Sequence, residues 1–348
     1  MSRIIAIANQ KGGVGKTTTS VNLSAALVGL RKKVLLIDLD PQGNATMGCG
    51  VDKHEVDTGI FDVLVDGMPI PEALTTVAHN VWDVLAANSD LTAAEVELMS
   101  MEGREHRLYD ALRTSREHYD YILIDCPPSL NILTLNAFVA TDSVLVPVQC
   151  EYYALEGLSA LLETIDGVRE SVNPNIAIEG LLRTMYDGRN KLGLEVSAQL
   201  VEHFGDQVLQ TVVPRNVRLA EAPSHGVSIL EYDATSRGAL AYLALAGEIV
   251  RRNAAALQET ADQKTSEHLD TQVADQVENP NESAASSDNP ESLQSDENVG
   301  STQAVSPSTE SDAPDNGDFA ANGNELETQS AQAELTEHQP NDIVPANG

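Results

Sequence analysis

The feature of the sequence that most constrains its fold is a segment rich in lysine and glycine at residues 11–18, KGGVGKTT. An apolar run, Ile4–Ala8, precedes this segment, and a helix-length stretch, Thr17–Leu30, follows its glycines. Glycines let successive backbone N–H groups converge on an anion without obstruction by side chains, and the free amides at the start of a helix favour negative charge. The sequence therefore predicts a phosphate-binding loop between a strand and a helix.

Two side chains of this loop have the chemistry that a nucleotide requires. In the general pattern G-x-x-x-x-G-K-[ST], Lys16 is expected to neutralise the β- and γ-phosphates, and the Thr17 hydroxyl is expected to ligate Mg²⁺. Gln10 occupies the first glycine position of that pattern, and an additional lysine, Lys11, precedes the glycines. The segment is therefore a variant phosphate loop with two lysines.

Short apolar runs alternate with helix-length stretches over the first 255 residues. Near-continuous apolar runs are typical of strands that are buried on both faces of a parallel sheet. The predicted strands are Ile4–Ala8, Val34–Leu39, Val81–Leu85, Tyr121–Ile124, Val144–Val148 and Ile178–Leu182. The predicted helices are Thr17–Leu30, Thr92–Met101, Glu105–His118, Glu156–Ser171, Leu192–Phe204 and Arg237–Arg252. This alternation predicts an α/β fold with a doubly wound, mostly parallel sheet flanked by helices.

Charge is distributed unevenly along the 348 residues, whose formal net charge is −32. Residues 256–348 contain 20 of the 53 acidic residues and one basic residue, Lys264, and they include no Trp, Tyr or Cys. Residues 1–255 contain 33 acidic and 20 basic residues. Apolar side chains beyond residue 255 are too sparse to offset the entropy of ordering the chain. We therefore predict a folded domain at 1–255 and a disordered, acidic, low-complexity tail at 256–348.

The composition disfavours several classes of protein. No apolar run approaches the roughly 20 residues that span a bilayer, and the N-terminus lacks the apolar core of a signal peptide. The three cysteines, Cys49, Cys126 and Cys150, are isolated in the sequence, and the eight histidines are scattered. These spacings argue against a disulfide framework and against paired metal ligands. A reducing cytoplasm is the predicted location.

Five motifs together resemble the ParA/MinD family of ATPases, and in particular its chromosome-partitioning ParA (Soj) branch. The segment KGGVGKTT is similar to the deviant Walker A motif of that family. The other four motifs, in the same order as in the family, are DLDPQGN at 38–44, DCPPS at 125–129, PVQCEYYALEG at 147–157 and PRNVRLAEAPSHG at 214–226. The resemblance covers residues 1 to about 252, and it implies a P-loop NTPase fold that hydrolyses ATP with Mg²⁺.

The resemblance also implies a role for each matching residue. The loop residues expected to bind the nucleotide are Lys11, Gly12, Gly13, Val14, Gly15, Lys16, Thr17 and Thr18. Asp40 is expected to position the attacking water, so that Lys11, Lys16 and Asp40 are the candidate catalytic residues. Asp125 corresponds to the Walker B carboxylate and is expected to hold Mg²⁺ together with Thr17. Pro214 and Asn216 are expected to contact adenine.

Three kinds of partner follow from the same resemblance. In the family, the lysine at the position of Lys11 reaches the nucleotide of a second subunit, which implies an ATP-dependent homodimer with ATP sandwiched between the subunits. Such dimers bind DNA non-specifically, and Arg189 and Arg218 are the matching residues for this contact. They act with a ParB-type centromere-binding protein in chromosome or plasmid segregation, which implies a cytoplasmic, nucleoid-associated protein. The net negative charge of residues 1–255 opposes DNA binding at long range, so this expectation depends on the resemblance alone.

Other functions are compatible with the same loop. A MinD-like membrane-surface positioning ATPase needs a C-terminal amphipathic helix with a basic face, whereas residues 256–348 are acidic. A metal-cluster ATPase needs cysteines that can bridge two subunits, and the three cysteines here have no C-x-x-C spacing. For the acidic tail, two interpretations remain open, namely an electrostatic brake on DNA binding and a solubilising extension.

Overall fold

A computed structural model describes residues 2–77 and 82–277 of the chain. Their core is an eight-stranded sheet with the strand order β3-β4-β2-β5-β1-β6-β7-β8. The strands are β1 (Arg3–Ile7), β2 (Val34–Asp38), β3 (Leu74–Thr76), β4 (Asp83–Leu85), β5 (Tyr121–Asp125), β6 (Ser143–Gln149), β7 (Ala177–Tyr186) and β8 (Val208–Pro214). Neighbouring strands are parallel except for the pair β3–β4. The predicted mostly parallel sheet is confirmed.

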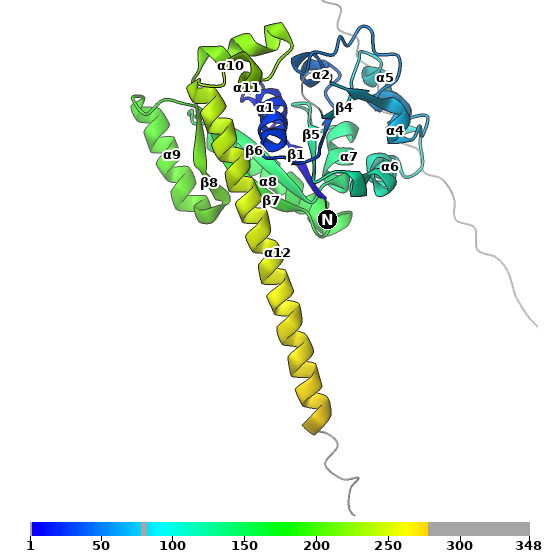
Figure 1. Ribbon diagram of the computed structural model, residues 1–348, viewed down its shortest axis with the longest axis vertical. Helices are drawn as coiled ribbons and strands as arrows, with labels where there is room; N and C mark the ends of the chain where they lie inside the picture. Colours follow the sequence, from blue (N-terminus) through cyan, green and yellow to red (C-terminus); the bar gives the residue numbers. More distant parts are fainter. Residues whose placement is uncertain (1, 78–81, 278–348) are drawn as a thin grey trace, which may run out of the picture. The chain divides into compact units, whose positions relative to one another are not determined.

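Helices connect the strands and cover both faces of the sheet (Figure 1). They are α1 (Lys16–Gly29), α2 (Asn44–Gly48), α3 (Ile60–Leu64), α4 (Ile70–Ala73), α5 (Leu91–Met99), α6 (Arg107–Ser115), α7 (Ile132–Ala140), α8 (Ala154–Ser171), α9 (Lys191–Phe204), α10 (Val217–Glu221), α11 (Ile229–Tyr232) and α12 (Arg237–Val277). Four short 3₁₀ turns, η1 (Arg104–His106), η2 (Arg116–His118), η3 (Gly205–Gln207) and η4 (Ala222–His225), complete the described segments.

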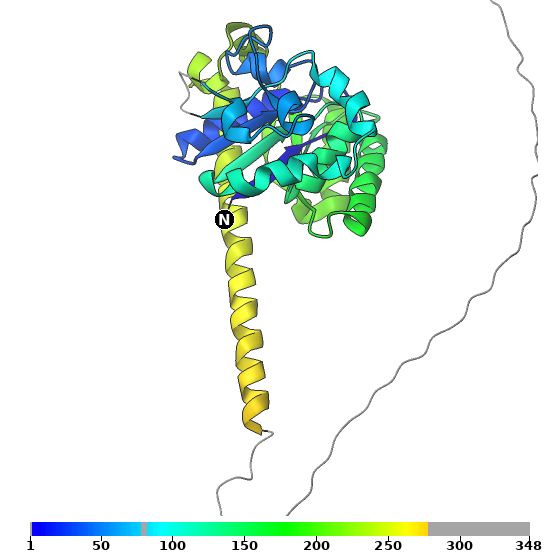
Figure 2. The same ribbon diagram turned by 90° about the vertical axis from the view of Figure 1, so that its right-hand side faces the viewer.

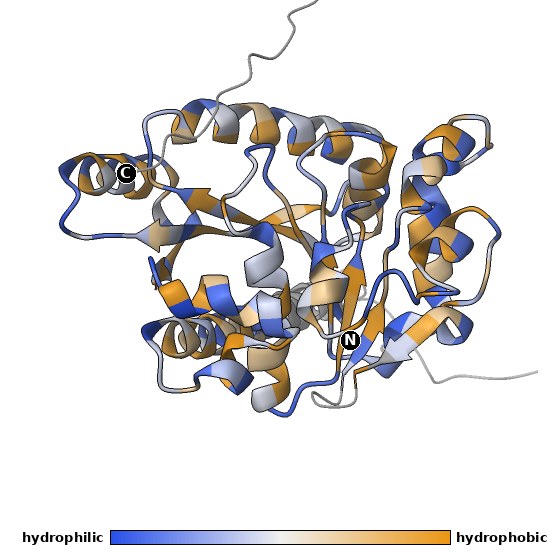
Figure 3. Cartoon of the chain, turned by 90° about the horizontal axis from the view of Figure 1, so that it is seen from above, coloured by the Kyte–Doolittle hydropathy of each residue, from blue (hydrophilic) through white to orange (hydrophobic). Residues whose placement is uncertain are grey.

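Each face of the sheet has its own hydrophobic core. Successive strand side chains point to opposite faces, so Ile4 and Ala6 pack with α3 and α5–α9, whereas Ile5 and Ile7 pack with α1, α2 and α10–α12. The strands are accordingly apolar along most of their length, while the helices alternate apolar and polar sides (Figure 3). This two-sided burial explains the near-continuous apolar runs in the sequence.

Several elements were not predicted from the sequence, and α7 and β3 show why. Helix α7 has an apolar sequence around most of its circumference and is buried between the sheet and other helices, so it lacks the amphipathic period by which a surface helix is detected. Strand β3 is three residues long and pairs in the antiparallel direction at the edge of the sheet. The predicted strand Val81–Leu85 corresponds to β4, and its first residue lies outside the described residues.

Helix α12 is longer than expected. It was predicted to end at Arg252, and disorder was predicted from residue 256, yet the helix continues to Val277 and extends beyond the sheet (Figures 1 and 2). Residues 253–277 contain no Gly or Pro and are rich in Ala and Gln, which favour helix. The predicted boundary at 255/256 therefore lies within α12, and the remainder of the predicted tail, 278–348, lies outside the described residues. In the part of the chain that the structure describes, no helix is long and apolar enough to cross a membrane.

Candidate active site

The candidate active site lies beyond the carboxyl ends of the three central strands. Strands β2, β5 and β1 are neighbours in the sheet, and Asp125 at the end of β5 is in register with Asp38 of β2 and Ile7 of β1. Ligands of open α/β sheets bind at this edge. The segments that follow these strands, which include the phosphate loop and Asp40, therefore lie next to one another.

The phosphate loop is built as the glycine pattern predicted. Gly13 and Gly15 adopt φ angles of 71° and 92°, in the left-handed region that glycine enters without strain. The Thr184 hydroxyl of β7 donates a 2.8 Å hydrogen bond to the Val14 carbonyl, and the Asn9 side chain accepts one from the Lys11 amide at 2.9 Å. Among the described residues, no side chain caps the start of α1, so its first amides are available to an anion.

Lys16 is buried at the start of α1, with 7% of its surface exposed. Burial lowers the pKa of its ammonium group below the usual value, and the strongest opposing influence is the charge of Asp125. Its Nζ donates one long hydrogen bond, 3.4 Å, to the Lys11 carbonyl. Lys16 is therefore a desolvated cation for which nucleotide phosphates would be favourable partners.

Asp125 is fully buried and accepts hydrogen bonds from two hydroxyls of α1. Thr17 Oγ1 donates to Asp125 Oδ2 at 2.8 Å, and Ser20 Oγ donates to Asp125 Oδ1 at 2.7 Å. Burial, followed by the negative charge of Asp38, raises the pKa of Asp125 above its usual range. A cation beside this carboxylate would stabilise its charged form against burial and against the negative charge of Asp38.

The residues around Asp125 fit a magnesium ion that arrives with a nucleotide. No group of three His, Cys, Asp or Glu side chains suited to a metal is present within residues 2–77 and 82–277. Mg²⁺ in nucleotide enzymes is held by one or two protein groups, by water and by the substrate phosphates, and a complete protein cage is not needed. The Thr17 hydroxyl and the Asp125 carboxylate are the residues that would hold it.

A neutral replacement tests this arrangement. We expect Asp125→Asn to abolish the stabilisation of the protein by Mg²⁺ and ATP while raising the melting temperature of the nucleotide-free protein, because the buried charge is removed. A carboxyl group whose pKa is raised by folding destabilises the folded protein increasingly as the pH rises toward that pKa. The gain in melting temperature of the variant should therefore be larger at pH 8 than at pH 5. Thermal unfolding with and without Mg²⁺ and ATP measures both effects. Equal nucleotide-dependent shifts in variant and wild type would exclude Asp125 as a ligand.

Asp38 fixes the turn that carries Asp40. The buried Asp38 carboxylate accepts hydrogen bonds from the Thr46 amide and the Thr46 hydroxyl, both at 2.8 Å, and from the Asp40 amide at 3.1 Å. Burial raises the pKa of Asp38 above its usual range, and the bonds from Thr46 oppose that shift. Asp40 itself is 9% exposed, and its Oδ1 accepts a hydrogen bond from the Gln42 amide at 3.0 Å. No sequence motif identifies the contact between Asp38 and Thr46, because it joins the end of a strand to a helix turn.

The Thr46 hydroxyl also accepts a 2.9 Å hydrogen bond from the Ala87 amide. We expect Thr46→Val, a change of similar shape, to lower the free energy of unfolding by about 1–3 kcal/mol, because it leaves buried polar groups unpaired. The change also removes a bond to Asp38, which holds the turn that carries Asp40. The rate of ATP turnover should therefore fall more than the affinity for ATP. Denaturant unfolding and steady-state kinetics test this prediction, with Thr58→Val at an exposed threonine as the control. Unchanged stability would show that the Thr46 hydroxyl is dispensable.

Lys11 has different surroundings from Lys16. Its Nζ forms a 2.8 Å ion pair with Glu151 Oε2, on the turn between β6 and α8, and both side chains are partly exposed to solvent. Glu151 Oε1 also accepts a 2.5 Å hydrogen bond from Gln149. The ammonium group of Lys11 is therefore held at the rim of the site.

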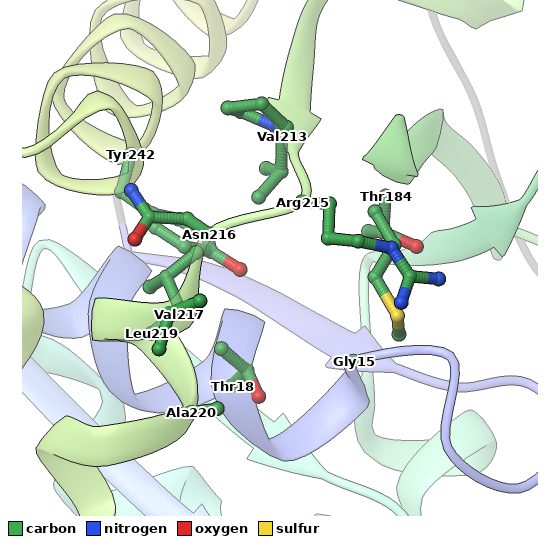
Figure 4. Close-up of a pocket in the computed structure, with 12 residues that line it drawn as sticks. Gly15, Thr18, Thr184, Val213, Arg215, Asn216, Val217, Leu219, Ala220 and Tyr242 are labelled. Carbon is green, nitrogen blue, oxygen red and sulfur yellow. The ribbon is translucent and has the colours of Figure 1, made fainter. Parts of the chain in front are cut away.

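A cavity of about 340 Å³ adjoins the phosphate loop (Figure 4). Pro214 and Asn216, for which adenine contacts are predicted, line it together with Gly15 and Thr18 of the loop. No contact with the nucleotide was predicted for the other lining residues, which are Thr184, Met185, Val213, Arg215, Val217, Leu219, Ala220 and Tyr242. Its walls are largely apolar, with a few polar groups, which is the character of a site for a planar base.

The two arginines predicted to contact DNA lie at the surface, outside the cavity and the loop. Arg189 donates through Nε and Nη2 to both carboxylate oxygens of Asp187, each at 2.9 Å. Arg218 donates to Glu221 at 2.8 Å and lies 3.7 Å from Asp233. Each predicted DNA contact therefore has a carboxylate partner of its own, which offsets part of its positive charge.

Known proteins are similar to this chain in sequence. Residues 2–178 match the family model described as AAA domain. The chain is 53% identical over 249 residues to the sporulation initiation inhibitor protein Soj of Bacillus subtilis, which covers 72% of this chain and 98% of that protein. It is 52% identical over 252 residues to the chromosome-partitioning ATPase Soj of Thermus thermophilus, covering 72% of this chain and 96% of that protein.

A solved structure resembles the fold as well. Cobyrinic acid a,c-diamide synthase of Mycobacterium smegmatis, crystallised with an ATP analogue and magnesium, superposes with a TM-score of 0.64 at 36% identity, over 72% of this chain and 95% of that one. The ligands of that structure are consistent with the use of ATP and Mg²⁺ by this chain.

Proposed function

The chain belongs to the ParA/MinD family of ATPases, and from that premise we propose that it drives chromosome or plasmid segregation as an ATP-dependent DNA-binding dimer. It is an ATPase that uses ATP and Mg²⁺. The dimer, the binding of DNA and the action with a ParB-type centromere-binding protein are parts of the proposal. The observation that carries it is the difference between the two loop lysines, since Lys16 is buried beside Asp125 and Lys11 lies at the rim on Glu151.

Each group at the strand ends has a proposed part in hydrolysis. Adenine occupies the cavity lined by Pro214 and Asn216, which directs the phosphates toward the first turn of α1. Lys16 binds the β- and γ-phosphates, while Thr17 and Asp125 hold Mg²⁺, which supplies charge neutralisation on the phosphate oxygens when bound. Asp40 orients the attacking water through the carboxylate oxygen that the Gln42 amide leaves free.

Lys11 acts on the nucleotide of the second subunit in this proposal. Its position at the rim suits a contact across an interface better than a contact with the γ-phosphate of its own subunit. Formation of the dimer then requires Lys11 to exchange Glu151 for the phosphates of the partner's ATP. Hydrolysis removes the γ-phosphate, weakens that contact and lets the subunits separate.

DNA binding depends on the dimer because one subunit offers few basic residues. Arg189 and Arg218 are the proposed contacts, each after release from its carboxylate partner. Residues 1–255 are net negative, so the affinity should be modest and should fall steeply with salt. We also propose a cytoplasmic, nucleoid-associated location, and a division of the chain into an ATPase domain and an acidic tail.

DNA binding measured with ATP, with ADP and without nucleotide tests the proposed function. Retention of the protein on DNA at low salt with ATP only, together with a doubling of its mass, is the expected result. A protein that ignores DNA with ATP but sediments with anionic liposomes would instead be a membrane-surface positioning ATPase. Failure to dimerise at saturating Mg²⁺ and ATP would overturn the proposal.

A further inference from the structure

A second cavity, of about 350 Å³, lies at the amino ends of the strands and shares no residue with the nucleotide cavity. Val34, which begins β2, and Asp83, which begins β4, both line it. The phosphate loop and Asp125 lie beyond the carboxyl ends, so the two cavities are at opposite ends of the sheet. The other lining residues are Val28, Arg31, Lys32, Lys33, Trp82, His118 and Tyr119. We refer to this space as the amino-edge cavity, and its size suits a small organic ligand.

Three consecutive basic residues line one side of the amino-edge cavity. Arg31, Lys32 and Lys33 are the longest run of basic residues in the chain. Within residues 2–77 and 82–277, their side chains form no ion pair and no hydrogen bond. Lys33 contacts Asp120 through its backbone amide, at 2.8 Å, and not through its ammonium group. In the described part of the chain, these three charges are therefore available to an anion.

Arg31 occupies a backbone position that favours glycine. Its φ angle is 61°, and it follows Leu30, the C-terminal cap of α1. The Arg31 amide donates to the Val28 carbonyl at 2.8 Å, and the next amide, of Lys32, donates to the Leu27 carbonyl at 3.1 Å. Helices that end in this pattern usually have glycine at the left-handed position, because any other side chain is strained there. A strained residue that lines a cavity indicates a role for its side chain.

Aromatic rings line the cavity beside these charges. His118, the last residue of η2, and Tyr119 are both in the lining. The Tyr119 hydroxyl donates a 2.7 Å hydrogen bond to Asp83 Oδ2, which fixes the ring. Aromatic side chains stack on nucleic-acid bases, and arginine and lysine bind phosphate oxygens. The amino-edge cavity therefore combines the two kinds of group that hold a nucleotide.

Carboxylates limit the extent of the basic surface. Asp83 lines the cavity, Asp120 lies beside the Lys33 backbone, and Glu117 is exposed next to His118 in the sequence. A long polyanion such as DNA would meet these carboxylates as well as the three cations, and residues 1–255 are net negative. A small ligand occupies the cavity alone. The arrangement thus favours a small phosphorylated molecule over DNA.

We propose that the amino-edge cavity is a second nucleotide site, which binds a nucleoside diphosphate. Its phosphates contact Arg31, Lys32 and Lys33, and its base packs against His118 and Tyr119. The cavity is separate from the ATP site, and the inference does not depend on the proposed dimer or on DNA binding.

The chain offers a local reporter for this test, because Trp82, in the lining of the cavity, is its single tryptophan. The probes are guanosine diphosphate and inorganic pyrophosphate, titrated into the full chain. All proteins carry Lys16→Ala, which removes the lysine proposed to bind phosphates in the ATP site. Calorimetry measures the affinity, and a change in Trp82 fluorescence locates the bound probe at the amino-edge cavity.

The variants remove the charges of the cavity without reversing them. They are Arg31→Gln and, separately, Lys32→Gln with Lys33→Gln, and the matched control is Lys191→Gln with Arg237→Gln, two exposed cations elsewhere. We expect each cavity variant to weaken both probes at least about tenfold, because charge-assisted contacts with phosphate are lost, and the control to stay within about twofold of the parent protein. Guanosine diphosphate should bind more tightly than pyrophosphate, and His118→Ala should weaken only the former, about fivefold or more.

Arg31→Gly separates a binding role from a structural one. Glycine relieves the strain at positive φ, so the melting temperature should rise by about 1–4 °C while affinity for both probes falls at least about tenfold. Arg31→Gln keeps a strained side chain and should lose affinity without the gain in stability. Unchanged affinity in Arg31→Gly would show that the guanidinium group has no part in binding.

Several results would overturn the inference. The cavity is not a nucleotide site if the parent protein binds neither probe, or if the cavity variants bind both as the parent does. Equal weakening in the control variant would attribute the effect to net charge. Equal affinity for the two probes would remove the base from His118 and Tyr119. A short DNA duplex that changes Trp82 fluorescence, where guanosine diphosphate does not, would assign the cavity to nucleic acid instead.

Discussion

Asp40→Ala is expected to slow ATP hydrolysis by about 100-fold or more while the protein still binds ATP, because the change removes the group that orients the attacking water. Asp40 follows the end of β2, and the bonds of Asp38 to the Asp40 amide and to Thr46 hold its turn in place. Alanine preserves those backbone contacts. With hydrolysis blocked, the dimer has no route to separation, so the variant should remain on DNA with ATP long after the wild type has dissociated.

Single-turnover hydrolysis and the lifetime of the protein on immobilised DNA measure the two effects separately. Asp57→Ala removes an exposed carboxylate from the loop between α2 and α3 and serves as the control. A variant at Asp40 that hydrolyses ATP at the wild-type rate would assign water positioning to another group. Slow hydrolysis without a longer lifetime on DNA would show that release from DNA does not depend on hydrolysis.

Lys11→Ala is expected to abolish ATP-dependent dimerisation and, with it, DNA binding, while ATP still binds to the monomer. The reason is that Lys16, Thr17 and Asp125 remain in place to hold the nucleotide, whereas the cation proposed to reach the second subunit is lost. Sedimentation with Mg²⁺ and a non-hydrolysable ATP analogue measures the dimer, and a fluorescent nucleotide measures binding to the monomer.

Two further variants make this prediction more specific. Lys33→Ala, at the opposite end of the central strands, removes an exposed lysine and should dimerise normally. Glu151→Gln weakens the hold on Lys11 in each subunit. An exposed ion pair contributes about 1 kcal/mol at most, and two such pairs are released per dimer, so the dimer should form at up to about 30-fold lower protein concentration. Normal dimerisation of Lys11→Ala would refute the role of Lys11 across the interface.

The sequence predicted the parallel sheet and the phosphate loop because both depend on short-range patterns. Residues buried on both faces of a strand, such as Ile4–Ile7, must be apolar without interruption. The same reasoning missed α7, whose apolar circumference conceals its helical period, and it ended α12 too early, because low hydrophobicity beyond Arg252 was equated with disorder. Low hydrophobicity limits tertiary packing, but it does not prevent a helix in a stretch without Gly or Pro.

By itself, the sequence determined which groups could bind phosphate and magnesium, because Gly13, Gly15, Lys16 and Thr17 lie within one loop whose conformation depends on its own residues. The tertiary structure alone decided what surrounds them. Parallel strands require long crossover connections, so neighbours at the sheet edge are distant in sequence, as Thr184 and Tyr242 are from the loop they adjoin. The partners of charged groups were decided in the same way, since the contact of Lys11 with Glu151 depends on where β6 lies beside β1.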